Sequence, residues 1–487
     1  MTQASITHVP LFTFNSGAPE GRFGLSVSGA GDVNGDGVAD LIVGRPGNGD
    51  FFTGSSDVFS GVDGSVLHTF VGGRFFPSDF PIEDLFGGSV SSAGDVNGDG
   101  FADLIVGAHR HAELTDSGRR TDSGRAQVFS GVDGSVLYSF VGDSGSDVLG
   151  GSVSDAGDVN GDGVPDLIVG IRGGDANGLN TGSARVLSGA DGSILYDFDG
   201  DSEGDDFGVS VSGAGDVNND GFADLIVGAR LDDNNGENSG SARVFSGADG
   251  SILYNFDGDS AGDIFGNSVS GAGDVNGDGF ADLIVRAPGD GSDRAIVFSG
   301  NDGSVLYNFN FSEPGDFFVG SRFNFIGGFN GSSVSGAGDV NGDGFADLIV
   351  GHSREDNNGL NSGIARVFSG VDGSVLYTFS GDAAGDGFGF SVSGAGDING
   401  DGLDDFIVGA PSGGPQSGGY ARVFVSQIRG SFVLGDVDQD GAVTFADIPA
   451  FIEVLTTGVF LEQADCNQDG EVNFDDIPVF IELLTNA

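Results

Sequence analysis

One nine-residue pattern, D-x-N-x-D-G-x-x-D, occurs seven times in the chain. Consecutive copies begin 58 to 65 residues apart, and their first aspartates are Asp32, Asp95, Asp158, Asp216, Asp274, Asp339 and Asp397. Self-similarity at a nearly constant spacing indicates a repeat architecture, in which each copy adds one supersecondary unit to a common core. The chain is therefore predicted to be a repeat protein over most of its length.

Each copy concentrates oxygen-bearing side chains at loop positions 1, 3, 5 and 9, with a glycine at position 6 that permits a sharp turn. Calcium prefers six to eight oxygen ligands, and the backbone carbonyl at position 7 would add another. The alternative is that Asp-Asn-Gly sequences simply form turns. Three carboxylates crowded into nine residues repel one another without a cation, so seven such copies favour calcium binding.

The predicted calcium ligands of these loops share the same five positions in every copy. They are Asp32, Asn34, Asp36, Val38, Asp40, Asp95, Asn97, Asp99, Phe101, Asp103, Asp158, Asn160, Asp162, Val164, Asp166, Asp216, Asn218, Asp220, Phe222, Asp224, Asp274, Asn276, Asp278, Phe280, Asp282, Asp339, Asn341, Asp343, Phe345, Asp347, Asp397, Asn399, Asp401, Leu403 and Asp405.

A strand is expected on either side of each loop. An apolar run such as Leu225-Ile226-Val227 follows the loop without alternation, which is typical of a short strand buried on both faces. In the fourth repeat we expect strands near 209–212, 223–227, 242–246 and 251–256. Four antiparallel strands per repeat make one blade of a β-propeller.

The repeats resemble the FG-GAP repeat of the integrin α-subunit propeller. Phe-Gly precedes the first aspartate by nine residues in five copies, and Leu149-Gly150 and Asn330-Gly331 stand at this place in the other two. The Gly-Ala-Pro half of the motif is kept at Gly409-Ala410-Pro411, whereas Arg286 replaces its glycine in the fifth copy. The resemblance implies an all-β seven-bladed propeller over residues 1–430, with calcium loops on one face and a role in adhesion or ligand binding.

The N-terminus is expected to close this ring. Residues 9–14 resemble the fourth strand of a blade but have no blade before them, whereas the seventh repeat stops after its third strand at 422–425. We therefore predict that the first strand of the chain completes the last blade, which removes two exposed sheet edges.

Residues 431–487 form a second, smaller domain in this prediction, with two twelve-residue calcium loops of EF-hand type, each followed by an amphipathic helix pattern. The duplicated loop and helix resemble a type I dockerin, which implies a small α-helical module and a cohesin-like partner. Phe445-Ala446 and Phe474-Asp475 replace the Ser-Thr pair that dockerins often use for recognition, which argues against cohesin itself. The predicted ligands are Asp436, Asp438, Asp440, Asp447, Asp465, Asn467, Asp469 and Asp476.

Length variation is concentrated in the loops on the face opposite the calcium loops. Insertions at 71–88 and 310–330 are rich in phenylalanine, and 108–124 carries His109 and His111. These histidines could be metal ligands, but without a carboxylate partner we expect them to be solvated. Insertions on one face commonly mark a binding side, although these rings could instead pack against the propeller. The candidate ligand-binding residues are Arg74, Phe75, Phe76, Phe318 and Phe323. The arginines that recur on third strands, Arg185, Arg243, Arg366 and Arg422, are expected to form structural ion pairs.

Composition limits the function classes. The formal net charge is −55, and all 18 basic residues are arginine, which argues against nucleic acid as a partner and excludes lysine chemistry. Cys466 is the only cysteine, and no apolar run is long enough to span a membrane. No signal peptide is visible at the N-terminus. We predict a non-enzymatic, secreted or cell-surface protein that uses calcium and binds an extracellular protein or glycan; the alternatives are a secreted hydrolase or a calcium-dependent lectin acting on polysaccharide.

Overall fold

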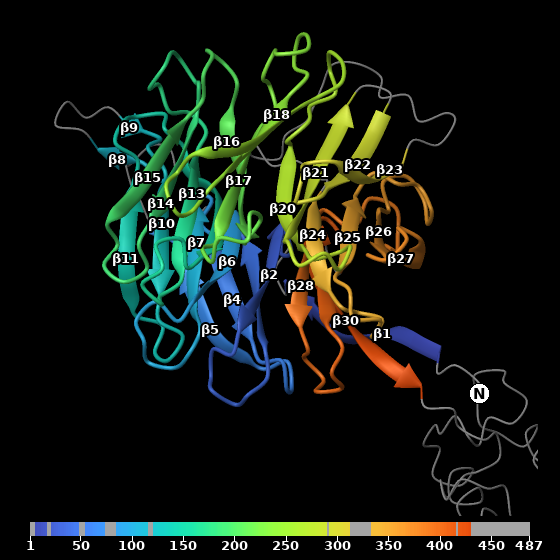
Figure 1. Cartoon of the computed structure of the whole chain (residues 1–487). Helices are drawn as coiled ribbons and strands as arrows, with labels where there is room; N and C mark the ends of the chain where they lie inside the picture. Colours follow the sequence, from blue (N-terminus) through green and yellow to red (C-terminus); the bar gives the residue numbers. More distant parts are fainter. Residues whose placement is uncertain are drawn as a thin grey trace, which may run out of the picture. The chain divides into compact units, whose positions relative to one another are not determined.

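The structure, a computed structural model, describes residues 5–16, 21–47, 54–73, 84–114, 120–289, 292–311, 333–414 and 417–429. These residues form β-strands joined by turns and loops, arranged as seven four-stranded sheets and one two-stranded ribbon (Figure 1). The chain divides into two compact units, Met1–Thr7 with Gln427–Ala487, and His8–Ser426. The second unit holds the sheets, while residues 431–487, with the predicted dockerin-like module and its eight ligands, lie outside the described residues.

Each four-stranded sheet is one blade, with its first strand at the axis and its fourth strand at the outer edge. The first three blades are β2 (Ser26–Gly31), β3 (Asp40–Arg45), β4 (Ser55–Phe59), β5 (Val66–Val71); β6 (Ser89–Gly94), β7 (Asp103–Ala108), β10 (Arg125–Phe129), β11 (Val136–Val141); and β12 (Leu149–Gly157), β13 (Asp166–Ile171), β14 (Ser183–Leu187), β15 (Ile194–Asp199). The ribbon inserted in the second blade is β8 (Glu113–Leu114) with β9 (Arg120–Thr121).

The remaining four blades repeat this order. They are β16 (Phe207–Gly215), β17 (Asp224–Ala229), β18 (Ser241–Phe245), β19 (Ile252–Asp257); β20 (Ser268–Gly273), β21 (Asp282–Gly289), β22 (Ser292–Phe298), β23 (Val305–Asn310); β24 (Val334–Gly338), β25 (Asp347–His352), β26 (Ile364–Phe368), β27 (Val375–Ser380); and β28 (Ser391–Gly396), β29 (Asp405–Ala410), β30 (Tyr420–Arg429), β1 (Ser5–Asn15).

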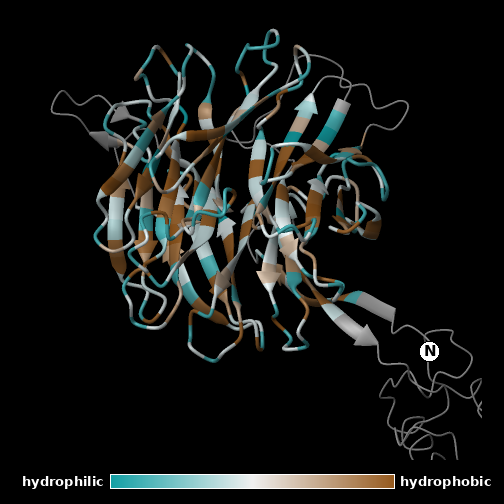
Figure 2. Ribbon diagram, in the orientation of Figure 1, coloured by the Kyte–Doolittle hydropathy of each residue, from teal (hydrophilic) through white to brown (hydrophobic). Residues whose placement is uncertain are grey.

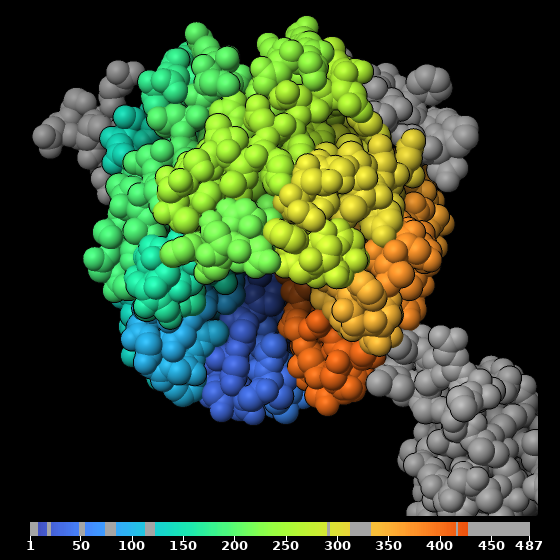
Figure 3. All heavy atoms as spheres, in the orientation of Figure 1, coloured from blue at the N-terminus to red at the C-terminus, as the bar shows by residue number. Residues whose placement is uncertain are grey.

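The blades form a closed ring around an axis lined by their first strands. Each first strand packs beside the first strand of the next blade, and β28 of the seventh blade returns to β2 of the first. The seventh sheet has the order β1-β30-β29-β28, so the N-terminal strand is its outermost member, which is the pairing that the sequence suggested. Figure 1 shows blue β1 beside orange β30, and Figure 3 shows the blue first blade against the orange seventh.

Hydrophobic residues are concentrated in the strands and hydrophilic residues in the connections (Figure 2). All six residues of β17 are buried, as expected for the uninterrupted apolar run. The fourth strand is the outer edge, and Ile252 at its start is half exposed. The core therefore lies between blades, where seven clusters of buried residues in the described chain each join one blade to the next.

The phenylalanine of each Phe-Gly pair belongs to these interblade clusters. Phe207 is fully buried and meets Phe245 edge to face at 6.3 Å between ring centroids. Phe198 of the preceding blade stacks on Phe245 at 3.9 Å between ring centroids. The glycine after it, Gly208, has a φ of 82°, and a Cβ there would overlap the carbonyl oxygen of Ser183. The Phe-Gly pair thus combines a buried ring with a backbone approach that only glycine permits.

The junction between the fifth and sixth blades replaces this arrangement with a buried ion network. Arg286 is fully buried and binds Asp293 through two contacts of 2.7 Å, and His352 of the sixth blade lies 3.1 Å from the same carboxylate. Phe311 lies 4.7 Å beneath the Arg286 guanidinium and meets Phe368 edge to face at 6.0 Å. Phe311, at the start of the aromatic insertion 310–330, is therefore a core residue that fills the place of the missing Phe-Gly phenylalanine.

Candidate functional site

The seven D-x-N-x-D-G-x-x-D loops connect the first and second strands of their blades and share one structure. The position-1 aspartate caps the turn: the amide of Gly37 donates to Asp32 Oδ2 at 2.9 Å, and the amide of Asp36 donates to Asp32 Oδ1 at 3.1 Å. The bond from the position-6 amide occurs in all seven loops. Position 6 requires glycine because its φ is positive throughout, for example 85° at Gly37.

The side chains at positions 3 and 5 turn back into the same loop. Asn34 Oδ1 accepts from the Asp36 amide at 2.9 Å, which places the oxygens of positions 1 and 3 around one nitrogen. Asp36 Oδ1 accepts a hydrogen bond from the Val38 amide, which fixes the backbone at loop position 7. Asn34 Nδ2 also lies 3.5 Å from Asp40 Oδ1. Positions 1, 3 and 9 therefore converge.

The position-9 aspartate is fully buried at the start of the second strand in every blade. Asp224 accepts from the Val217 amide at 2.9 Å and from Gly247, at the turn between the third and fourth strands, at 2.9 Å. Burial raises the pKa of Asp224 to about 6, and the negative charge of Asp220 acts in the same direction. The hydrogen bonds act in the opposite direction, because they favour the charged carboxylate. The turn and the loop thus share one buried carboxylate, which places both at the same end of the propeller.

These loops fit a hard divalent cation. In the fourth loop, Asn218 Oδ1, the position-3 oxygen, is buried and has no hydrogen-bond partner in the structure. Buried polar atoms without a partner are rare, and a cation on the oxygens of Asp216, Asp220 and Asp224 would satisfy this one. All the converging side-chain donors are oxygens, which are the ligands calcium prefers.

On the opposite face, the exit loops connect the fourth strand of one blade to the first strand of the next. The exit loops at 142–147, 200–205, 258–263 and 381–386 share the pattern G-D-[S/A]-x-x-D. Arginines of the following blade bind their first aspartate: Arg185 contacts Asp143 at 2.9 Å, Arg243 contacts Asp201 at 2.6 Å, and Arg422 contacts Asp382 at 2.8 Å. The predicted ion pairs are confirmed for these three arginines; Arg366 lies over the Phe311 ring, and most of the exit loop before its blade lies outside the described residues.

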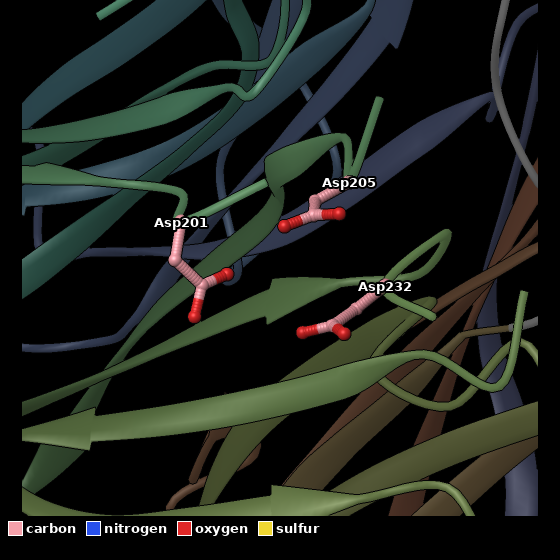
Figure 4. A group of neighbouring side chains, drawn as sticks. All are labelled: Asp201, Asp205 and Asp232. Carbon is pink, nitrogen blue, oxygen red and sulfur yellow. The ribbon is translucent and has the colours of Figure 1, made fainter. Parts of the chain in front are cut away.

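Asp201, Asp205 and Asp232 form an acidic cluster between the third and fourth blades, with their carboxylates turned toward one another (Figure 4). Burial, followed by the hydrogen bond to Asp201, raises the pKa of Asp205 to about 7. Although burial acts the other way, the Arg243 guanidinium lowers the pKa of Asp201. Asp232 accepts from Ser241 Oγ at 2.6 Å. Arg243 contacts Asp201 at 2.6 Å and Asp232 at 3.8 Å, so one guanidinium partly offsets the charge of this cluster.

Two sequence expectations on this face have different outcomes. His109 and His111 are buried, so the expectation of solvated histidines is wrong; burial, and then the nearby Arg125, lower the pKa of His111 to about 4, which keeps its ring neutral. The candidate ligand-binding residues Arg74, Phe75, Phe76, Phe318 and Phe323 lie outside the described residues, so their role stays a prediction.

A ring of serines surrounds the propeller axis at the same end as the exit loops. Each is the first serine of a Ser-Val-Ser sequence that recurs ahead of every loop, and the ring consists of Ser26, Ser89, Ser152, Ser210, Ser268, Ser333 and Ser391. In six cases the serine oxygen accepts a hydrogen bond from the backbone amide of the Ser-Val-Ser valine in the next blade, at 3.0–3.3 Å. The serine ring therefore links neighbouring blades around the axis.

Six segments of the chain match the family model of the FG-GAP repeat, at 23–61, 86–129, 207–245, 265–307, 330–368 and 388–424. The third blade, where Leu149 stands in place of phenylalanine, is not among them but has the same four strands. The chain thus carries FG-GAP repeats in a seven-bladed β-propeller.

Integrin α chains are similar to part of this chain. Integrin alpha-5 of Xenopus laevis is 31% identical over 225 residues, which cover 42% of this chain and 20% of that protein; integrin alpha-V of Gallus gallus is 31% identical over 216 residues, with the same shares. The chain thus spans about a fifth of the length of these curated relatives. Among solved structures, the Dos1 propeller aligns with a TM-score of 0.41 and 10% identity over 80% of this chain and 75% of that one, too weak a likeness for argument.

Proposed function

We propose that this chain of FG-GAP repeats, which resembles integrin α chains over part of its length, is a calcium-stabilised extracellular binding or adhesion protein. The observation that carries the proposal is the difference between the loops at the two ends of the propeller. One end holds seven nearly identical oxygen-rich loops, and the connections at the other end range from four exit loops of one pattern to the insertions at 71–88, 108–124 and 310–330. Repeated parts provide stability, and variable loops on a rigid scaffold provide specificity.

In this proposal each loop binds one calcium ion through the side chains of positions 1, 3, 5 and 9 and the carbonyl of position 7. A bound ion would supply positive charge where three carboxylates meet, and would tie the loop to the buried aspartate at the start of the second strand. That aspartate also anchors the turn between the third and fourth strands. Calcium would therefore stabilise the whole end of each blade.

The ligand in this proposal is an extracellular protein or glycan that binds the face with the exit loops, and residues 431–487 form a calcium-binding dockerin-like module that docks to a second partner. Binding is favoured over a hydrolase because Arg243 contacts two of the three carboxylates of the acidic cluster on this face. Within the described residues, no helix is long and apolar enough to cross a membrane.

The metal count tests the first part of the proposal. Elemental analysis of the dialysed full chain should find nine calcium ions, seven in the propeller and two in the C-terminal module. Asp224→Asn should remove one ion from the count. The control Asp249→Asn, which changes an exposed turn aspartate whose carboxylate caps the Ser251 amide, should remove none. A count unaffected by Asp224→Asn would contradict calcium binding at that loop.

The ligand is sought with protein and glycan arrays probed with the full chain in calcium and again after chelation. Calcium-dependent binding to an extracellular protein or a glycan supports the proposal. Turnover of a polysaccharide by the purified chain, lost in a variant of the exit loops, would favour the hydrolase instead.

A further inference from the structure

The propeller axis contains a cavity of about 170 Å³ at the end where the first strands begin. The serine ring surrounds it, and His109, Arg172 and Asn267 also line it. This cavity belongs to the face of the exit loops and is separate from the calcium loops at the other ends of the same strands. Its lining is mainly polar, which distinguishes it from the apolar layers between blades.

The serine ring presents hydrogen-bond donors to this cavity. Each hydroxyl has one hydrogen to donate and two lone pairs to accept with. In Ser210, for example, the oxygen accepts the Val269 amide at 3.1 Å, and among the described residues the hydroxyl hydrogen has no acceptor. The same holds for the other five serines whose oxygen accepts an amide. The blades therefore fix the oxygens and leave the hydrogens available to a bound acceptor.

Arg172 is the charged side chain in the described lining of this cavity, since the lining histidine is His109 and the other residues are uncharged. Arg172 lines it, and burial together with the neighbouring Arg230 and Arg110 lowers the pKa of Arg172, while Asp206 acts in the other direction. Asp206 binds Arg230 at 2.7 Å. No aspartate or glutamate is found among the described lining residues, although the chain has 73.

We infer that this axial cavity binds a small oxyanion, a carboxylate or sulfate group, through Arg172 and the hydroxyls of the serine ring. The donors suit this ligand because charged acceptors form stronger hydrogen bonds than neutral ones, and several donors here converge on one space. A cation is disfavoured because the described lining offers no carboxylate. The group can come from a free ion or from an acidic sugar. The inference does not depend on the ligand of the proposed adhesive function.

The test uses isothermal titration of the full, calcium-loaded chain at constant ionic strength with three probes: sulfate, galacturonate and the neutral sugar galactose. Binding of sulfate, of galacturonate or of both supports the inference, and the pattern identifies the source of the oxyanion. Absence of binding for both anions would overturn it, and so would equal binding of galactose, because the site would then recognise hydroxyls rather than charge.

Matched variants locate the site. Arg172→Gln should weaken anion binding about tenfold or more, because hydrogen bonds to charged groups are among the strongest. Arg185→Gln removes the same charge from the same blade at a residue bound to Asp143 and Asp197, and should leave the affinity unchanged. If Arg185→Gln weakens binding equally, the effect is a general attraction to charge and the inference fails.

A second pair of variants stays informative if Arg172→Gln does not fold. Ser210→Ala removes one hydroxyl from the serine ring and should weaken anion binding about two- to tenfold. Ser212→Ala lies on the same strand, where the hydroxyl donates to Gly213 outside the cavity, and should have no effect. Equal affinities in the two serine variants would show that the ring does not contact the anion.

Discussion

The backbone amide of Val27 donates a 3.1 Å hydrogen bond to the hydroxyl oxygen of Ser391, across 364 positions of the chain. The same bond joins five of the other six pairs of neighbouring blades, at separations of 59 to 66 positions. The contact that elsewhere joins consecutive repeats therefore joins the first repeat to the last one here. The ring closes at the axis through this bond and at the rim through β1.

The first prediction concerns this closure. A chain that begins at Gly21 lacks β1 and leaves β30 with an unpaired edge, and it also loses Phe14, which stacks on Phe59 at 4.0 Å. We expect aggregation or the loss of a single cooperative unfolding transition, measured by calorimetry. Ser391→Ala is the mild control and should cost about 1 kcal/mol. A truncated chain that melts like the full chain would contradict the closing role of β1.

Calcium removal is the second prediction. At about 2 mM calcium and a dissociation constant of roughly 0.1 mM, each occupied site would stabilise the fold by about 2 kcal/mol. Chelation should therefore lower the melting temperature markedly, and readdition of calcium should restore it. Magnesium at the same concentration is the control, because the ion is smaller and demands tighter geometry. An unchanged melt in EDTA would rule out a structural role for the metal.

The third prediction is a pH dependence of the calcium-free protein. Burial raises the pKa of the position-9 aspartates to about 6 or 7 in the folded chain, from an unfolded value of 3.8; they are Asp40, Asp103, Asp166, Asp224, Asp282, Asp347 and Asp405. Between these values the folded state binds more protons than the unfolded state. The stability that these seven groups contribute is therefore fully present below about pH 4 and is lost as the pH rises through 6 to 7.

Denaturant midpoints of calcium-depleted protein at about pH 5 and about pH 8 measure this effect. Asp224→Asn should reduce the difference between the two midpoints, because it removes one titrating group. Asp249→Asn controls for the general reduction of negative charge and should leave the difference nearly unchanged. Greater stability at the higher pH in the absence of calcium would contradict the raised pKa of these carboxylates.

The fourth prediction concerns the buried ion network between the fifth and sixth blades. Arg286→Met should destabilise the protein by about 3–5 kcal/mol, because it leaves the Asp293 carboxylate buried without its arginine. The double variant Arg286→Met with Asp293→Leu should recover much of the loss, since it removes both charges. Chemical denaturation of the two variants measures this. A double variant less stable than the single one would show that the network stabilises beyond its own desolvation cost.

The fifth prediction separates ligand binding from packing among the phenylalanines of the insertions. Replacing Phe75, Phe76, Phe318 and Phe323 together with serine should abolish partner binding and leave the calcium-dependent melt nearly intact, because large aromatic rings are common binding hot spots. Phe311→Ser is the contrast: it empties a core position and should cost about 3–5 kcal/mol. If the quadruple variant unfolds instead, those rings belong to the core.

The sequence alone determined the number of blades and the position of the loops, and it predicts which oxygens of those loops would bind calcium. This was possible because the signals are local: nine consecutive residues specify a loop, an apolar run specifies a buried strand, and repetition multiplies both. The missing fourth strand of the last blade likewise predicted the place of residues 9–14, since an unpaired edge had only one candidate partner.

Only the tertiary structure decided how residues from different blades meet. The Arg286–Asp293–His352 network, the acidic cluster at Asp205, and the serine ring each combine side chains from separate blades. Phe311 looked like part of an insertion, but it fills a core position, because the neighbouring blade supplies the surrounding contacts. Burial likewise decided that His109 and His111 lie inside the fold. Contacts of this kind depend on the geometry of the closed ring, and no local pattern encodes that geometry.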